Sequence, residues 1–222
     1  MLDTSLHLGL NLLFLAGIGL AAFGSGRLIL GNVPLASFSE SVVFSAGLGF
    51  GLLSCSVFLL CSLGLLYPQV VYILVGLWAV LAWPGILRTR RASNPKPSFP
   101  SALPLWDKVA LLILVISLFI CLLLVLTPAI GNDALVYHLA VPKEFISHHG
   151  FCPIEGNIFA HYPLNMEMLY IVALVLRGDI LAKGLHFTMA VLTLLAMWGF
   201  SKAHIRKGVP SFLPLLIFFS IP

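Results

Sequence analysis

The residue best placed to do chemistry is Asp133, which follows 24 uncharged residues after Lys108. A stretch of that length crosses a bilayer core of about 30 Å at about 1.5 Å per residue, so Asp133 is expected where lipid gives way to water. A carboxylate there is partly desolvated, and its ionisation responds to neighbouring groups. We predict that Asp133 is a general base that takes the proton from a substrate hydroxyl. The plainer alternative, an N-cap for a helix that begins at Ala134, is compatible with that role.

Polar side chains recur after Asp133 at helical spacing. At about 100° per residue, one face of a helix over 133–149 carries the polar residues and the other carries the apolar ones. The polar face comprises Asp133, Tyr137, Glu144 and His148, and the apolar face comprises Leu135, Leu139, Pro142 and Ile146. We expect an amphipathic helix that lies along the membrane surface, kinked where Pro142 cannot bond to the carbonyl of His138. Tyr137, Glu144 and His138 are candidates for orienting the base or the acceptor, although the polar face could also be merely solvated.

Three cations of the same region, Lys143, His161 and Lys183, have no evident topological role. At the membrane surface the expected anions are lipid phosphates, which these side chains could bind. Asp179 and Lys183 are four residues apart, so a simple ion pair along one helix is the alternative for that lysine. The histidines lack metal-ligand spacing, and we predict neither a metal nor another cofactor.

The composition identifies the kind of protein that holds these residues. The 222 residues are 60% hydrophobic and 9% charged, and the mean hydropathy is +1.07. Ordinary soluble domains carry about 25% charged residues, so a soluble enzyme and a disordered chain are excluded, and nucleic acid is not an expected partner. Uncharged intervals long enough for five spans lie between the charged residues, namely 4–26, two crossings within 41–87 with a turn at Tyr67-Pro68-Gln69, 109–132 and 184–201. The fold class predicted is an all-α polytopic membrane protein.

A basic, proline-rich linker divides the chain. We expect a three-span block over 1–87, a cytoplasmic linker over 88–108, and a second membrane domain over 109–222 with an external loop over 128–179. A sixth span begins near Val209 and has few residues before Pro222. The sequence is therefore expected to be the N-terminal portion of a longer protein and to be inactive alone.

Lysine and arginine predict the orientation. With the linker in the cytoplasm, nine basic and two acidic residues lie inside, and three basic and six acidic residues lie outside. This distribution satisfies the positive-inside rule if the apolar stretch Pro163–Leu176 forms a helix that does not cross the membrane. We therefore predict a multi-pass protein of the plasma (inner) membrane, with the loop that contains Asp133 on the external or periplasmic side.

Three motifs carry a resemblance to a known family. They are 132–145 (NDALVYHLAVPKEF), 161–170 (HYPLNMEMLY) and 178–187 (GDILAKGLHF). Together they resemble the beginning of the GT-C membrane glycosyltransferases, in particular the family 39 type, which includes protein O-mannosyltransferases and aminoarabinose transferases. In that family a span leads into an external loop that begins with an essential acid, and juxtamembrane helices and a Pro-Leu element follow.

The resemblance covers 109–222 and implies a function. Asp133 matches the family's catalytic aspartate, His161 the basic residue before Pro-Leu, and Lys183 an arginine after an alanine. Two positions depart from the pattern: Ala134 stands where many members have a second acid, and Tyr162 replaces a proline. The resemblance implies transfer of a sugar, with inversion, from a polyprenyl phosphate to a hydroxyl of a lipid, glycan or protein acceptor.

In this hypothesis Asp133 is the base, and Lys183, His161 and Lys143 hold the donor phosphate. Two other classes of protein stay open. One is a transporter or flippase of a lipid-linked anion, which would be expected to place ionisable residues deep in the spans. The other is a non-catalytic membrane subunit.

Overall fold

The computed structural model describes residues 2–91, 103–204 and 212–220, and these residues form helices and no strands. Five of the helices are long and apolar enough to cross a membrane, which identifies a multi-pass membrane protein. They are α1 (Leu2–Leu30), α2 (Phe38–Ser62), α3 (Pro68–Arg91), α4 (Leu105–Val125) and α7 (Asp179–His204). The number of spans predicted for this part of the chain is confirmed. Most of the proline-rich linker lies outside the described residues, as does Val209, and the C-terminal stretch contributes the short helix α8 (Leu213–Ser220).

The turn between α2 and α3 lies slightly earlier than the sequence suggests. α2 ends at Ser62, and Gly64 has a φ of 68°, a left-handed conformation that glycine adopts without steric cost. Pro68 is the first residue of α3 rather than the centre of the turn. Proline is favoured at the first position of a helix, because the backbone N–H of that position has no acceptor within the helix and its absence costs nothing.

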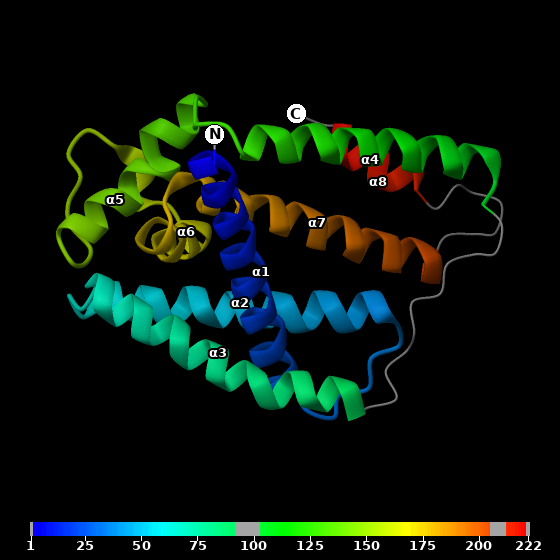
Figure 1. Ribbon diagram of the computed structural model, residues 1–222, viewed down its shortest axis with the longest axis horizontal. Coiled ribbons are helices and arrows are strands. Elements are labelled where there is room, and N and C mark those ends of the chain that lie inside the picture. The colour runs from blue at the N-terminus through cyan, green and yellow to red at the C-terminus, as the bar shows by residue number, and fades with distance from the viewer. Residues whose placement is uncertain (1, 92–102, 205–211, 221–222) are drawn as a thin grey trace.

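Helices α1, α2 and α3 pack through glycines. A Cβ on Gly49 of α2 would overlap the carbonyl oxygen of Ala22 in α1, and one on Gly85 of α3 would overlap that of Gly24. Glycine lets membrane helices approach until their backbones touch, which increases the van der Waals contact that holds them together. In Figure 1, α1 crosses α2 and α3 obliquely, and the three form one tight block.

Helices α4, α7 and α8 form a second packing group. Its buried members include Ala110 and Leu114 of α4 and Leu194 and Trp198 of α7. At one end, the buried carboxylate of Asp107 accepts a hydrogen bond from the backbone N–H of Phe212 at 3.0 Å. This bond holds the residue before α8 against the first turn of α4.

The short helix α6 (Asn165–Leu176) lies across the long helices near one end of the bundle, where Figure 1 shows it almost end-on between α2 and α7. Its 12 residues span about 18 Å, less than a bilayer core. The helix predicted over Pro163–Leu176 is present, two residues shorter. A hydrogen bond of 2.6 Å from Ser54 Oγ to the carbonyl of Asn165 fixes its first turn against α2.

The turn between α2 and α3 lies at the same end as the segment that follows α4. The backbone N–H of Leu66 donates to the carbonyl of His149, and the rings of Tyr67 and His149 stack with centroids 4.0 Å apart. The connection from α1 to α2 lies at the opposite end (Figure 1). The charge pattern predicts this grouping, because it assigns the turn and the 128–179 loop to one side of the membrane.

Candidate functional site

The segment expected to form one amphipathic helix after Asp133 is split into two pieces. A π-helical turn spans Ala134–His138, and helix α5 spans Ala140–Ser147. Pro142 has no N–H to offer the carbonyl of His138. The chain instead closes a wider turn in which the N–H of Leu139 donates to the carbonyl of Ala134 at 2.9 Å. The helix break therefore lies at Leu139, three residues before the proline at which the kink was expected, and α5 continues through Pro142.

The apolar face of α5 packs against protein. Val141, Pro142 and Phe145 are buried, and α5 contacts α6, while the ring of Phe145 meets that of Phe151 edge-on. Of the residues expected on the apolar, lipid-facing side, Leu139 and Pro142 are therefore buried in protein and Ile146 is half-buried. Leu135, which belongs to the preceding π-helical turn, is exposed.

A cavity of about 450 Å³ opens beside the π-helical turn, between α4 and α7. Its walls are mainly apolar, from Cys121, Leu124 and Val125 of α4, Ala134 and Leu139, Phe187 and Ala190 of α7, and Phe219 of α8. Its polar groups are His138, Tyr170, Lys183 and His186. An apolar cavity with a few polar groups is the usual form of a small-molecule site.

Glu167 of α6 binds His138. Its carboxylate lies 2.6 Å from His138 Nδ1, and the glutamate is 4% exposed, whereas the histidine side chain is 33% exposed. A buried carboxylate needs such a partner, because an unpaired one would lose its hydration without compensation. The bond also orients the imidazole, and its other nitrogen, Nε2, makes no hydrogen bond to any residue that the structure describes.

Tyr170 lies one helical turn after Glu167 and binds His186 of α7. The hydroxyl is 2.6 Å from His186 Nδ1, and burial, together with the nearby Glu167, raises the pKa of Tyr170. The phenol therefore stays protonated at neutral pH. This pair fixes α6 against α7 at the cavity wall.

Lys183 bridges α7 and α4. Its Nζ donates to the carbonyl of Leu124 at 3.3 Å and also to that of Thr127. These carbonyls belong to the last turn of α4 and the residues just after it, where a cation is favoured by the helix dipole. An ammonium group has three N–H donors, and the residues that the structure describes engage two of those of Lys183.

The other predicted phosphate-binding residues lie elsewhere. Lys143 pairs with Asp179 at 3.0 Å, so Asp179 is engaged by Lys143 of α5 rather than by Lys183 on its own helix. His161 lies further along the same loop and lines a separate hollow of about 300 Å³, which Glu155 also lines. The structure thus brings only one of the three predicted phosphate ligands to the cavity.

Asp133 is exposed and does not itself line the cavity. Its neighbour Ala134 lines the wall, and the Asp133 carboxylate forms no hydrogen bond or ion pair with any residue that the structure describes. Its backbone is helical and its side chain caps no helix, so the N-cap alternative is not what the structure shows. Tyr137 stacks on Phe159, and burial, then Asp133 and Glu167, raise the pKa of Tyr137.

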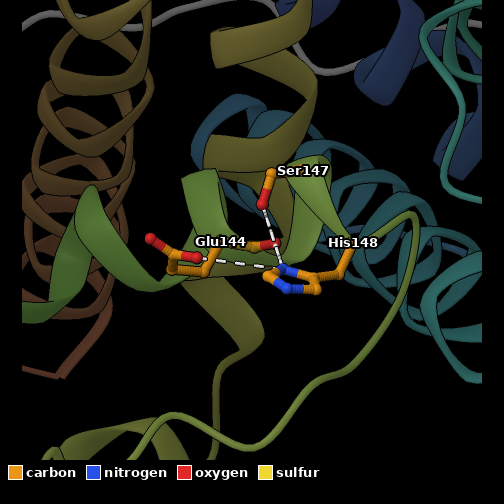
Figure 2. A network of polar contacts seen from close by, with 3 residues as sticks. All are labelled: Glu144, Ser147 and His148. Atoms are coloured by element: carbon orange, nitrogen blue, oxygen red, sulfur yellow. Dashed lines mark hydrogen bonds and ion pairs between the residues drawn. The ribbon is translucent and has the colours of Figure 1, made fainter.

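Glu144 does not line this cavity. Its carboxylate is 3.8 Å from His148 Nδ1, and that nitrogen also approaches Ser147 Oγ and the Glu144 carbonyl, as Figure 2 shows. Both side chains are more than half exposed. Exposed pairs of this kind contribute little to stability.

Sequence reasoning did not single out Glu167 and Tyr170 as site residues. Both belong to the 161–170 motif and are three residues apart, a spacing that puts them on one face of a helix. A carboxylate in the first turn of a short apolar helix is the signal that could have identified Glu167. The partners of these two residues, His138 and His186, are 29 and 16 residues away, which spacing along one helix cannot reveal.

Comparison with protein-family models, curated proteins and solved structures gives no match for this chain. The fold and the cavity therefore define its class, a multi-pass helical membrane protein with a polar-rimmed apolar cavity at one end of the bundle.

Proposed function

We propose that the protein is a glycosyltransferase of the plasma membrane that moves a sugar from a polyprenyl phosphate to an acceptor hydroxyl, with inversion. The observation that supports this proposal best is the cavity between α4 and α7, which combines apolar walls with the ammonium group of Lys183. A prenyl phosphate has the matching chemistry, an apolar chain that ends in an anion. The resemblance to GT-C glycosyltransferases adds the expectation that the sugar faces the external loop.

Asp133 is the proposed general base. The acceptor hydroxyl gives its proton to the Asp133 carboxylate while its oxygen forms a bond to the anomeric carbon of the sugar. The bond between that carbon and the phosphate oxygen breaks, and the electron pair leaves with the phosphate. Lys183 stabilises the charge that develops there. The exposed position of Asp133 next to the cavity wall is consistent with access by an acceptor from outside.

The test is the Asp133→Asn variant of the full-length protein. We expect sugar transfer to fall by about 10²–10⁴-fold, the usual contribution of a general base, in membranes supplied with a labelled polyprenyl-phosphate sugar. Glu155→Gln is the matched control, because Glu155 is also an exposed carboxylate of the same loop but lines the other hollow. Normal transfer by Asp133→Asn would remove the catalytic assignment. Lipid reorientation in vesicles without any glycosylated product would favour the transporter instead.

The side of the membrane is tested separately. Ser147 is exposed at the end of α5, and Lys202 is exposed at the opposite end of α7. In a background without the native cysteines, a membrane-impermeant maleimide added to intact cells should label Ser147→Cys and not Lys202→Cys. The reverse labelling would place the Asp133 loop in the cytoplasm and overturn the enzyme proposal.

A further inference from the structure

Only Lys183, among the cations predicted to hold phosphate, lines the cavity. Lys143 is engaged with Asp179, and His161 lies in another hollow. A phosphodiester that loses its sugar gains a negative charge, so stabilising its departure calls for more than one donor. Further donors must come from the other polar groups of the same cavity.

His138 is the group best suited to this task. Its Nδ1 faces the buried carboxylate of Glu167 at 2.6 Å, and His138 itself lines the cavity. An ionised carboxylate removed from water is best compensated by a cation, and a protonated imidazole leaves the pair neutral. Both ring nitrogens then carry hydrogens, so that Nε2–H remains as a charged donor after Nδ1–H has bonded to Glu167.

The neighbouring pair supplies one more donor. If the Tyr170 hydroxyl donates to His186 Nδ1, the other nitrogen of His186 carries the hydrogen. If His186 donates instead, the tyrosine O–H is unused. In either arrangement this pair, whose two side chains line the cavity, keeps one N–H or O–H that the pair itself does not use.

We infer that His138, held by Glu167, is a second phosphate-binding residue of this cavity and acts with Lys183 on a phosphate carried by an apolar chain. This inference rests on the proposed function and assigns His138 to the donor rather than to the acceptor. When the carbon–oxygen bond of the donor breaks, the electron pair stays on the phosphate oxygen, which accepts hydrogen bonds from His138 Nε2–H and Lys183 Nζ–H. The proton remains on His138, and Glu167 is a positioning residue that never touches the ligand.

Farnesyl phosphate is a suitable probe, with farnesol as the same chain without the anion. Binding of each is measured on the full chain in phosphatidylcholine nanodiscs, with empty nanodiscs as the blank. We expect the protein to bind farnesyl phosphate at least about tenfold more tightly than farnesol, the ratio that one charge-assisted hydrogen bond of about 1.5 kcal/mol provides. Excess inorganic phosphate should not displace farnesyl phosphate, because inorganic phosphate has no apolar chain to contact the walls of the cavity.

His138→Gln and Glu167→Gln test the pair. Each should weaken farnesyl phosphate binding about tenfold and leave farnesol binding unchanged, which also shows that the cavity has kept its shape. If Glu167 acts through His138, the double variant should bind no more weakly than either single variant, whereas independent structural effects would add. His148→Gln is the control, because its pair with Glu144 is exposed and neither residue lines the cavity.

Three results would overturn the inference. They are equal binding of farnesyl phosphate and farnesol by the unaltered protein, displacement by inorganic phosphate alone, and unchanged farnesyl phosphate binding in both single variants. Loss of farnesol binding in one variant shows that the substitution has distorted the cavity. The inference is then decided by the other variant and by the ratio of farnesyl phosphate affinity to farnesol affinity in the unaltered protein. A protein that binds farnesyl phosphate as expected but transfers no sugar from any lipid donor would refute the proposed function and leave this inference intact.

Discussion

The contact of α1 with α2 and α3 and the contact of α4 with α7 differ in the residues that line them. In the first, glycines bring backbones together, so that a Cβ on Gly49 would overlap the carbonyl oxygen of Ala22. In the second, α4 has no glycine, and leucine, isoleucine and valine make up most of its side chains. A cavity of about 450 Å³ remains there.

The two contacts suit different tasks: the glycine contacts of α1 with α2 and α3 give mechanical support, and the contact of α4 with α7 gives a ligand access. Helices joined by backbone contact have little room to move, because the packing of a glycine interface leaves no flexible side chain to adjust. Polar bonds hold α4 at both of its ends: Lys183 joins its last turn to α7, and Asp107 joins its first turn to the residue before α8. The first block is thus suited to holding α2 and α6 in place, and the second to admitting a chain from the lipid.

The largest effect is expected from Gly49→Ala, which introduces one methyl group where α1 and α2 touch. Because the neighbour is a backbone carbonyl that cannot rotate away, we expect a loss of about 3 kcal/mol in the free energy of unfolding, at the upper end for overpacking. Gly47→Ala in the same helix is the control, since nothing lies within 4 Å of its Cβ position. Unfolding in detergent measures both variants, and equal stability would contradict the backbone contact.

A smaller loss in the free energy of unfolding is expected from Asp107→Ala. The buried N–H of Phe212 loses its acceptor, which costs about 1–3 kcal/mol. Hydrogen exchange at Phe212 and α8 should accelerate by the corresponding factor. Asp107→Asn keeps an acceptor oxygen and should preserve most of the protection, so that equal acceleration in both variants would argue against this hydrogen bond.

Lys183→Met should loosen the outer end of α4 more than it lowers the overall stability. Its two bonds to backbone carbonyls are partly exposed to solvent, so we expect about 1 kcal/mol. Faster hydrogen exchange in 124–131 would report the freed helix end. Lys108→Met, at the other end of the same helix, should leave that segment unchanged.

Ala190→Leu should have the smallest effect on stability, within about 0.5 kcal/mol, since surface-like positions beside an open cavity tolerate added volume. It should nevertheless weaken farnesyl phosphate binding, because the new side chain occupies the space of the prenyl chain. Together with Gly49→Ala, it shows whether the two interfaces respond differently to added bulk. A loss as large as that of Gly49→Ala would mean that the cavity is closed in solution.

The sequence predicts those features that depend on neighbours along the chain. The five spans follow from the distances between charges. The short helix α6 follows from an apolar stretch of insufficient length. Each is decided by local composition and by the thickness of the bilayer.

Features that depend on distant partners could not be predicted in the same way. Helical spacing suggested that Asp179 pairs with Lys183, but α5 brings Lys143 within 3.0 Å of it. The bonds from His138 to Glu167 and from Tyr170 to His186 depend on how α6 lies across the bundle, which no interval in the sequence specifies. The burial of Pro142, which was expected on the apolar side of the surface helix, has the same origin, because α5 packs against α6.

The wide turn at Ala134–His138 has a consequence for chain length. A π-helical turn holds one residue more than an α-helical turn, and each residue rotates a helix by about 100°. Deleting one amino acid within 134–138 would therefore swing Asp133 by roughly that angle around the axis of α5, even if every polar side chain were retained. The direction of the Asp133 carboxylate thus depends on the number of residues between Asp133 and Pro142 as well as on their identity.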